Sequence, residues 1–130
     1  MSTARLRDVR AALDPVNHLP ERRDAVDVGI DPRAWMLARD VLGVIDPEHY
    51  RRSAVAGSAL YVASIAVQGE YRVHQPAVGD LVGVSDNAIR RHMSRVAETA
   101  IRELDVTKYG ADTDVLRHVA RTGKVKNLSW

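Results

Sequence analysis

The chain has 130 residues, of which 45% are hydrophobic and 28% charged, and its formal net charge is +2. This composition predicts one globular domain with a sizeable core. The absence of cysteine excludes disulfides, cysteine-ligated zinc and thiol catalysis. Phenylalanine is also absent, so the core must be built mainly from Val, Ala, Leu and Ile. The charged N-terminal segment has no apolar signal core, and we therefore expect a cytoplasmic protein.

The first part of the chain predicts helices separated by proline and glycine. Residues 3–13 show a short helical pattern that Pro15 ends, and a turn-rich connector follows. A weaker helix is expected at residues 21–28, ended by Gly29. Asp31 and Pro32 then have the residue types of an N-cap and a first helical position, which predicts a helix over residues 32–42. We expect Gly43 to end this helix, and Asp46 and Pro47 to form the next turn.

Residues 53–69 form a stretch without any charge, preceded by Arg51 and Arg52. A surface helix needs a polar face, and this stretch has little to offer for one. A membrane-spanning helix is the alternative, but a span needs about twenty strongly apolar residues. This run is shorter and contains two glycines and three serines. We therefore predict a buried central helix, whose small side chains let neighbouring helices approach closely.

The segment after the central helix has the pattern of a helix-turn-helix at residues 76–104. Pro76 opens a short helix over residues 77–82, Gly83 makes the turn, and Ser85 caps a long helix over residues 86–104. Glycine suits the turn because a positive φ angle costs it little. The inward stripe of the long helix consists of Ile89, Met93, Val96 and Ala100, which Leu104 extends.

The opposite face of the long helix carries side chains that suit DNA. Arginine can bind a guanine edge bidentately and asparagine an adenine edge, and the start of a recognition helix enters the major groove. Phosphate contacts suit the cap residue and the flanks of the helix, where His92 is expected beside Arg95. The predicted DNA-binding residues are Ser85, Asn87, Arg90, Arg91, Ser94 and Arg95. The alternative is that these arginines form only the solvated face of an amphipathic helix, and Asp80 and Asp86 would lie unfavourably near phosphates.

The remaining residues complete an all-α fold class. We predict a loop at residues 105–112, a last helix at 113–121 and a mobile, mildly basic tail at 123–130. No alternating strand pattern and no internal repeat is visible. The predicted organisation is an N-terminal helix and connector at residues 1–20, a five-helix domain at 21–105, and a C-terminal helix and tail at 106–130.

Catalytic and metal-binding patterns are missing from the sequence. The carboxylates are scattered, and the glycines do not have the spacing of a phosphate-binding loop. We therefore predict no enzyme activity, no cofactor and no metal. Metal-ligand spacing is also absent among the five histidines, which are His18, His49, His74, His92 and His118.

Three segments resemble the cyclin-like repeat of transcription initiation factor IIB and its archaeal counterparts. Ala59, Tyr61 and Ala63 match the A-x-Y-x-A pattern in the family's central helix. The run from residue 29 to 31, Gly-Ile-Asp, is similar to the junction between the first two helices of that repeat. The family's last two helices are echoed by Gln75, Val78, Gly83, Val84, Ser85, Ile89, Arg90 and Arg91. The resemblance covers about residues 21–104 and implies a cyclin-like five-helix domain with residues 53–68 at its centre.

The resemblance implies a sequence-specific, double-stranded DNA-binding transcription factor or regulator. In the family, the last two helices of the C-terminal repeat read DNA beside the TATA box, next to the TATA-binding protein. Full members carry a zinc ribbon and two repeats, whereas this chain has no cysteine and room for one repeat. Ala77 also replaces an acidic residue of the family pattern, and Gly79 stands where alanine is common.

The chain is therefore either a fragment of a longer factor or a stand-alone regulator. As a homodimer, a stand-alone regulator would gain a second half-site. Its expected partners are duplex DNA and the TATA-binding protein or another transcription protein, without a membrane. Two alternatives remain open, a cyclin-fold protein-interaction module and a helix-turn-helix repressor on an unrelated helical scaffold.

Overall fold

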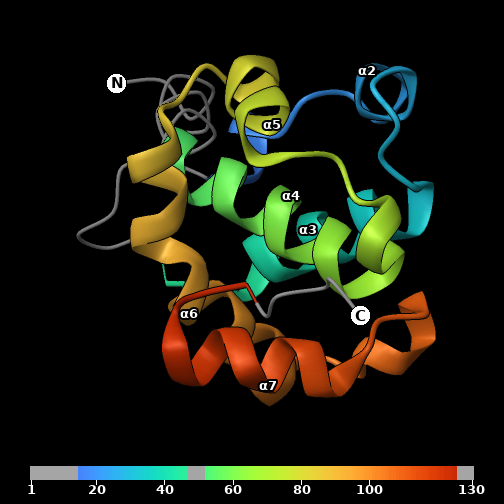
Figure 1. Ribbon diagram of the computed structural model, residues 1–130, viewed down its shortest axis with the longest axis vertical. Helices are drawn as coiled ribbons and strands as arrows, with labels where there is room; N and C mark the ends of the chain where they lie inside the picture. The colour runs from blue at the N-terminus through green and yellow to red at the C-terminus, as the bar shows by residue number, and fades with distance from the viewer. Residues whose placement is uncertain (1–14, 47–51, 126–130) are drawn as a thin grey trace, which may run out of the picture.

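One helix, α4 (Arg52–Gln68), runs through the middle of the molecule, and the other helices surround it (Figure 1). The computed structural model describes residues 15–46 and 52–125. These residues form six α-helices and three short 3-10 helices, with no strand in the described ranges. The all-α prediction is confirmed. The other α-helices are α2 (Arg22–Asp27), α3 (Pro32–Val44), α5 (Gln75–Val82), α6 (Asp86–Glu103) and α7 (Thr113–Thr122), and all of them except α2, which lies on α3, pack directly on α4.

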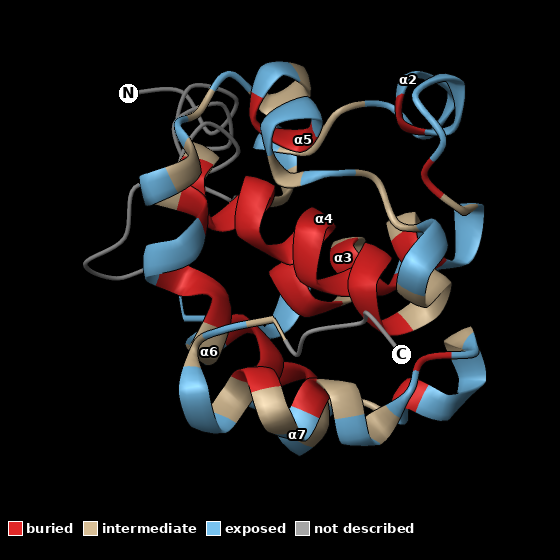
Figure 2. Ribbon diagram, in the orientation of Figure 1, coloured by how far each residue is buried: buried red, intermediate tan, exposed pale blue. Residues whose placement is uncertain are grey.

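Helix α4 is buried on nearly all sides, as its uncharged sequence predicts. Every residue from 54 to 66 is buried, and Figure 2 shows this helix as the largest continuous buried segment. Helices α3 and α6 make its most extensive contacts. Its small side chains allow these close approaches, and the Ser64 hydroxyl is satisfied within the helix by donating to the Tyr61 carbonyl at 2.7 Å. Within residues 15–46 and 52–125, no helix combines the length and apolar character needed to cross a membrane.

Helix α3 begins as predicted and ends later than predicted. The Asp31 carboxylate accepts a hydrogen bond from the Arg33 amide at 2.8 Å, and Pro32 is the first helical residue. Gly43 does not end the helix, which continues to Val44. The reason is Ile45, which is buried and donates its amide to the Val41 carbonyl at 2.9 Å. Docking this side chain in the core outweighs the modest helix penalty of glycine, about 1 kcal/mol.

The side chain of Gln68, the last residue of α4, joins three segments. Its Oε1 accepts from the Asp31 amide at 3.0 Å. Its Nε2 donates to the carbonyls of Gly29 at 2.9 Å and Tyr71 at 3.2 Å. These bonds fix the start of α3 against the end of α4.

The predicted connectors contain short helices that the sequence pattern did not indicate. They are the 3-10 helices η1 (Pro15–His18), η2 (Gly69–Tyr71) and η3 (Val106–Tyr109). Two further predictions, the helix at residues 3–13 and the turn at Pro47, lie outside the described residues, as does the tail beyond residue 125.

Helix α7 is present as predicted and belongs to the same core as α4. Asp112 caps it, because its carboxylate accepts from the Asp114 amide at 2.9 Å and from the Val115 amide at 3.3 Å. Leu116 and Val119 are buried in the core. The Asp112 amide also donates to the carbonyl of Ala66 in α4 at 2.8 Å. Helix α7 therefore packs on α6 and α4 together.

Candidate nucleic-acid interface

A tight glycine turn joins α5 to α6, and we call these two helices the α5–α6 pair. Gly83 has a φ of 82°, in the left-handed region that glycine adopts at little cost. The amides of Gly83 and Val84 both donate to the Gly79 carbonyl, at 2.7 and 2.9 Å. The Ser85 hydroxyl accepts from the Ala88 amide at 3.2 Å and caps α6. The predicted turn residue and the predicted cap are both confirmed.

Two glycines allow the turn to lie directly on the helices around it. A Cβ atom at Gly79 would lie 2.6 Å from the Val84 carbonyl oxygen, which is closer than real Cβ contacts. A Cβ atom at Gly57, in α4, would lie 2.9 Å from a methyl group of Val84. The Gln75 Nε2 also donates to the Asp86 carbonyl at 2.8 Å and ties the start of α5 to the start of α6. The relative orientation of the pair is therefore set by backbone and core contacts.

The inward face of α6 follows the predicted stripe. Ile89, Met93, Val96 and Ala100 are all at most 1% exposed. Ile89 also contacts Gly57 closely, since a Cβ there would lie 3.4 Å from its Cγ1. This packing fixes the rotation of α6 about its own axis and so determines which residues face outward.

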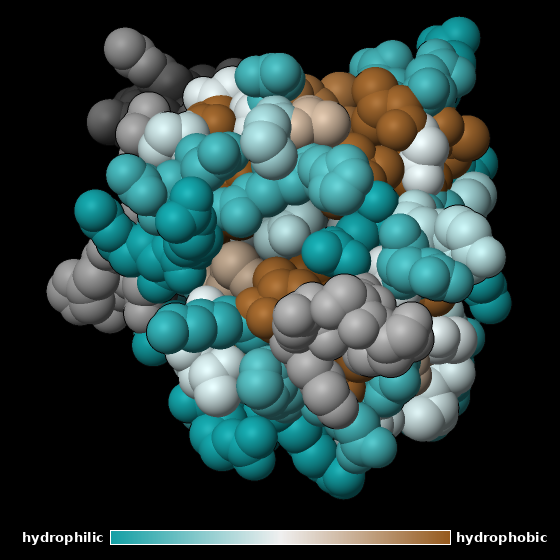
Figure 3. Space-filling model, in the orientation of Figure 1, coloured by the Kyte–Doolittle hydropathy of each residue, from teal (hydrophilic) through white to brown (hydrophobic). Residues whose placement is uncertain are grey.

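Four long polar side chains lie on the exposed part of α6. Asn87, Arg90, Arg91 and Arg95 are all exposed, and Ser85 is exposed at the cap. Within the described chain, Arg90 and Arg91 form no ion pair, so both guanidinium groups are available to a ligand. Figure 3 shows hydrophilic side chains covering this region of the surface.

Ser94 differs from the prediction of an outward position. Its side chain is only half-exposed, and its hydroxyl donates to the carbonyl of Ala120 at 2.6 Å. The acceptor belongs to α7, which covers this side of α6. Ser94 is thus a contact between two helices, and the structure does not bring it together with the exposed arginines.

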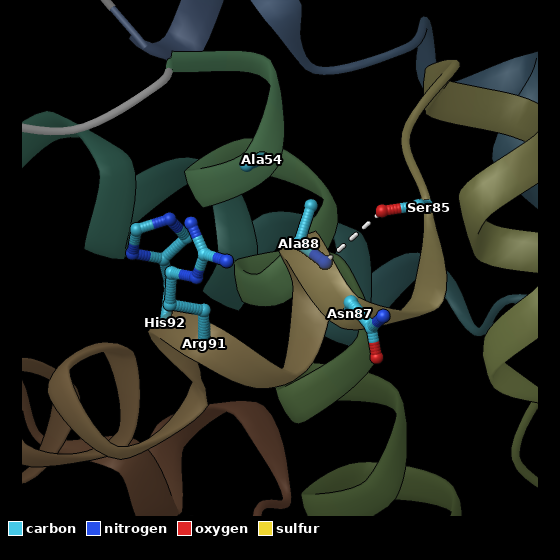
Figure 4. A pocket seen from close by; sticks show the side chains of 6 residues that line it. All are labelled: Ala54, Ser85, Asn87, Ala88, Arg91 and His92. Carbon is cyan, nitrogen blue, oxygen red and sulfur yellow. Dashed lines mark hydrogen bonds between the residues drawn. The ribbon is translucent and has the colours of Figure 1, made fainter.

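His92 also differs from its predicted place on the flank of α6. Its side chain is buried, and burial lowers its pKa below the ordinary value of 6.5, with a smaller contribution from the Arg91 charge. The ring is therefore neutral at pH 7 and offers no positive charge to a phosphate. Figure 4 shows His92 next to Arg91 in a small pocket of about 140 Å³ between α6 and the start of α4. The pocket is lined by Ala54, Ser85, Asn87, Ala88, Arg91 and His92.

The spacing of the inward residues contains a signal for the burial of His92. Position 92 lies three residues after Ile89 and four before Val96, so it shares the core-facing side of the helix. The roles of Gly57 and Gly79 had no comparable signal, because a glycine in a helical pattern does not reveal what approaches it. Among the described residues, no group of three or more His, Asp or Glu side chains could hold a metal ion.

No family model, curated protein or solved structure matches this chain. The similarity to the factor IIB repeat therefore stays a prediction from the sequence motifs. The geometry of the α5–α6 pair and the charges that it presents are the structural features that bear on function.

Proposed function

We propose that this protein binds double-stranded DNA as a transcription regulator, with α5 and α6 acting as a helix-turn-helix. One observation carries the proposal. The first half of α6 presents Asn87, Arg90 and Arg91, all exposed, from a helix whose orientation is fixed by Ile89 and by the Gly79–Val84 contact. Arginine and asparagine are the side chains that bind guanine and adenine edges bidentately.

The proposed fold is a single cyclin-like repeat of the factor IIB type. Its support is the central buried helix α4, which carries the A-x-Y-x-A motif, and the α5–α6 pair that packs against it. In this arrangement α4 supplies the surface that positions the reading helix. The runner-up is a helix-turn-helix repressor on an unrelated helical scaffold, which would use the same residues of α6.

In the proposed complex, the start of α6 enters the major groove. Arg90, Arg91 and Asn87 contact base edges, while Arg95 and the capped N-terminus at Ser85 contact phosphates. His92 is left out of this interface because it is buried and neutral. The carboxylates of Asp80 and Asp86 repel DNA phosphates. DNA should therefore approach through the face that carries the arginines.

The test is selection of duplexes from a random pool by the full chain, with and without TATA-binding protein, followed by affinity measurement on the selected duplex. We expect binding that weakens as salt is raised, because phosphate contacts release counterions. Replacing both Arg90 and Arg91 by Ala should weaken binding by about 30-fold or more, since a good bidentate contact contributes about 1–3 kcal/mol.

The matched control is Arg22→Ala with Arg23→Ala, which removes two adjacent exposed arginines from α2. This control should retain the affinity of the unchanged protein. If the two double variants lose the same affinity, or if neither loses any, the recognition-helix assignment is wrong.

A second candidate function, a cyclin-fold protein-interaction module, is favoured by exposed apolar side chains away from α6. Val26 and Val28 are 41% and 44% exposed, and Figure 3 shows hydrophobic atoms gathered between α2 and α5. This function predicts that a protein partner, such as another transcription protein, co-purifies and that its binding survives the Arg90 and Arg91 substitutions. Size measurement in solution shows whether the DNA-binding regulator is a homodimer, which would read two half-sites.

A further inference from the structure

The end of α7 packs beside the first half of α6, which carries the proposed base-reading residues. The Ser94 hydroxyl donates to the Ala120 carbonyl at 2.6 Å, and a Cβ atom at Gly123 would lie 3.8 Å from the Cβ of Ser94. The start of α7 is held instead at the end of α4, where the Asp112 amide donates to the Ala66 carbonyl. Figure 1 shows the red end of α7 next to α6. The last turn of α7 therefore borders the exposed face of α6.

The exposed side chains at this end of α7 are cationic. Arg121 lies in the last turn of the helix and Lys124 two residues beyond it, and both are exposed. Neither forms an ion pair within residues 15–46 and 52–125. Lys124 and Arg90 of α6 line the same surface hollow. The positive charge of α6 thus continues onto the end of α7.

The carboxylates of α6 and α7 are distributed differently from these cations. In the second half of α6, Arg102 pairs with Glu98 at 3.3 Å and with its own neighbour at position 103 at 3.0 Å. In the first half of α7, Arg117 pairs with Asp114 at 3.4 Å. Asp86, at the start of α6, is the remaining carboxylate of these two helices. Net positive charge is therefore concentrated where the end of α7 meets α6, and this suits a polyanion.

We propose that the end of α7 binds the phosphate backbone of the duplex beside α6, through Arg121 and Lys124. The inference rests on the proposed function and adds a second contact surface to it. A helix with its side chains is about 10–12 Å across and the major groove about 12 Å wide, so a helix fills the groove and its neighbours face the backbone. Arginine and lysine bind phosphate without reading the base. The end of α7 therefore contributes affinity and register but no base preference.

The first experiment measures affinity of the full chain for the selected duplex by fluorescence anisotropy, at a series of salt concentrations. The α7 variant carries Arg121→Gln and Lys124→Gln. It should bind about tenfold or more weakly at about 0.1 M salt, and its slope of log affinity against log salt should be about 2 smaller, since each phosphate contact contributes about 0.9. The matched control carries Arg22→Gln and Lys108→Gln, which removes the same charges from exposed positions in elements that pack on α3. The control should retain both the affinity and the slope.

The second experiment separates a backbone contact from base reading. It compares affinity for the selected duplex with affinity for the same duplex after one recognised base pair is changed. The α7 variant should keep this ratio, whereas Arg90→Ala with Arg91→Ala should lower it. Neutral methylphosphonate linkages are then placed singly along the selected duplex. At the phosphate that α7 contacts, neutralisation should weaken the unchanged protein and leave the α7 variant unaffected.

Two further measurements exclude unfolding as the cause of weaker binding. The melting temperature of the α7 variant should equal that of its control, because all four substituted side chains are exposed. The charge-retaining variant Arg121→Lys should bind the duplex as the unchanged protein does, since a phosphate accepts either cation.

The results that would overturn the α7 contact differ from those that would overturn the proposed function. The contact is wrong if the α7 variant behaves as its control, if its salt slope is unchanged, or if no single methylphosphonate distinguishes it from the unchanged protein. A loss of binding confined to the Arg90 and Arg91 variant supports the proposed function and overturns the α7 contact. A chain that binds no duplex overturns both.

Discussion

Helices α4 and α6 have similar lengths, 17 and 18 residues, and opposite relations to solvent. In α4, thirteen residues are buried, and most of them are small or aliphatic. In α6, seven residues are buried along one side, and arginines occupy much of the other. The difference separates two roles in this fold, a core helix and a helix with an exposed charged face. A central helix with small side chains lets several neighbours approach, and one of those neighbours, α6, keeps Asn87, Arg90 and Arg91 exposed.

Of the substitutions that test this difference, one in α4 should have the largest effect on stability. Leu60 is completely buried, and Leu60→Ala should lower the free energy of unfolding by about 2–5 kcal/mol, from lost apolar burial and the cavity left behind. Arg91→Ala, on the exposed face of α6, should change it by less than about 0.5 kcal/mol. Urea denaturation of both variants measures the difference. Comparable losses would show that the exposed face of α6 contributes to folding.

A smaller effect on stability is expected at the turn between α5 and α6, which packs on α4. Gly79→Ala should lower the free energy of unfolding by about 1–3 kcal/mol, because the added methyl group would lie 2.6 Å from the Val84 carbonyl oxygen. The matched control is Gly43→Ala in α3, where a Cβ meets nothing within 4 Å. It should gain up to about 1 kcal/mol from better helix propensity. Stabilisation by both substitutions, measured by thermal melting, would show that the turn can move away.

The smallest expected effect is on the pH dependence of stability, and it comes from His92 on the buried side of α6. Because burial lowers its pKa, the unfolded chain takes up a proton below pH 6.5 while the folded chain does not. The contribution of this residue to stability is therefore complete above about pH 7, and it falls as the pH is lowered through 6.5 towards the folded pKa. Melting temperatures between pH 7.5 and 5.5 should show this fall, and His92→Gln should reduce it. The control His74→Gln, at an exposed position, should leave the fall in melting temperature unchanged.

Local signals were sufficient for much of the fold. The absence of charge predicted the burial of α4, and the residue types at Asp31, Gly83 and Ser85 predicted two caps and a turn that the structure contains. These features depend on a few neighbouring residues, so a single sequence is enough to find them. The exposed positions of Asn87, Arg90 and Arg91 also followed from helical spacing.

The predictions that failed depended on contacts distant in the sequence. The Ser94 hydroxyl donates to a carbonyl 26 residues later in the chain, and no local pattern could reveal this contact. Gly43 remains helical because Ile45 docks in the core. The fit of Val84 against Gly57 and Gly79, for which the sequence made no prediction, also brings together three separate segments. His92 is different, since the inward spacing already contained the answer. Its polar side chain led to the prediction of a surface position, but packing against the core buries it.

The bonds made by Gln68 have a consequence for hydrogen exchange. The Asp31 amide precedes the first turn of α3, a position where backbone amides commonly exchange rapidly with solvent. Here its acceptor is a side chain 37 residues away, at the end of α4. The amide becomes accessible only when the start of α3 separates from the end of α4. Its exchange rate therefore reports the opening of the α3–α4 contact, at a residue that belongs to neither helix.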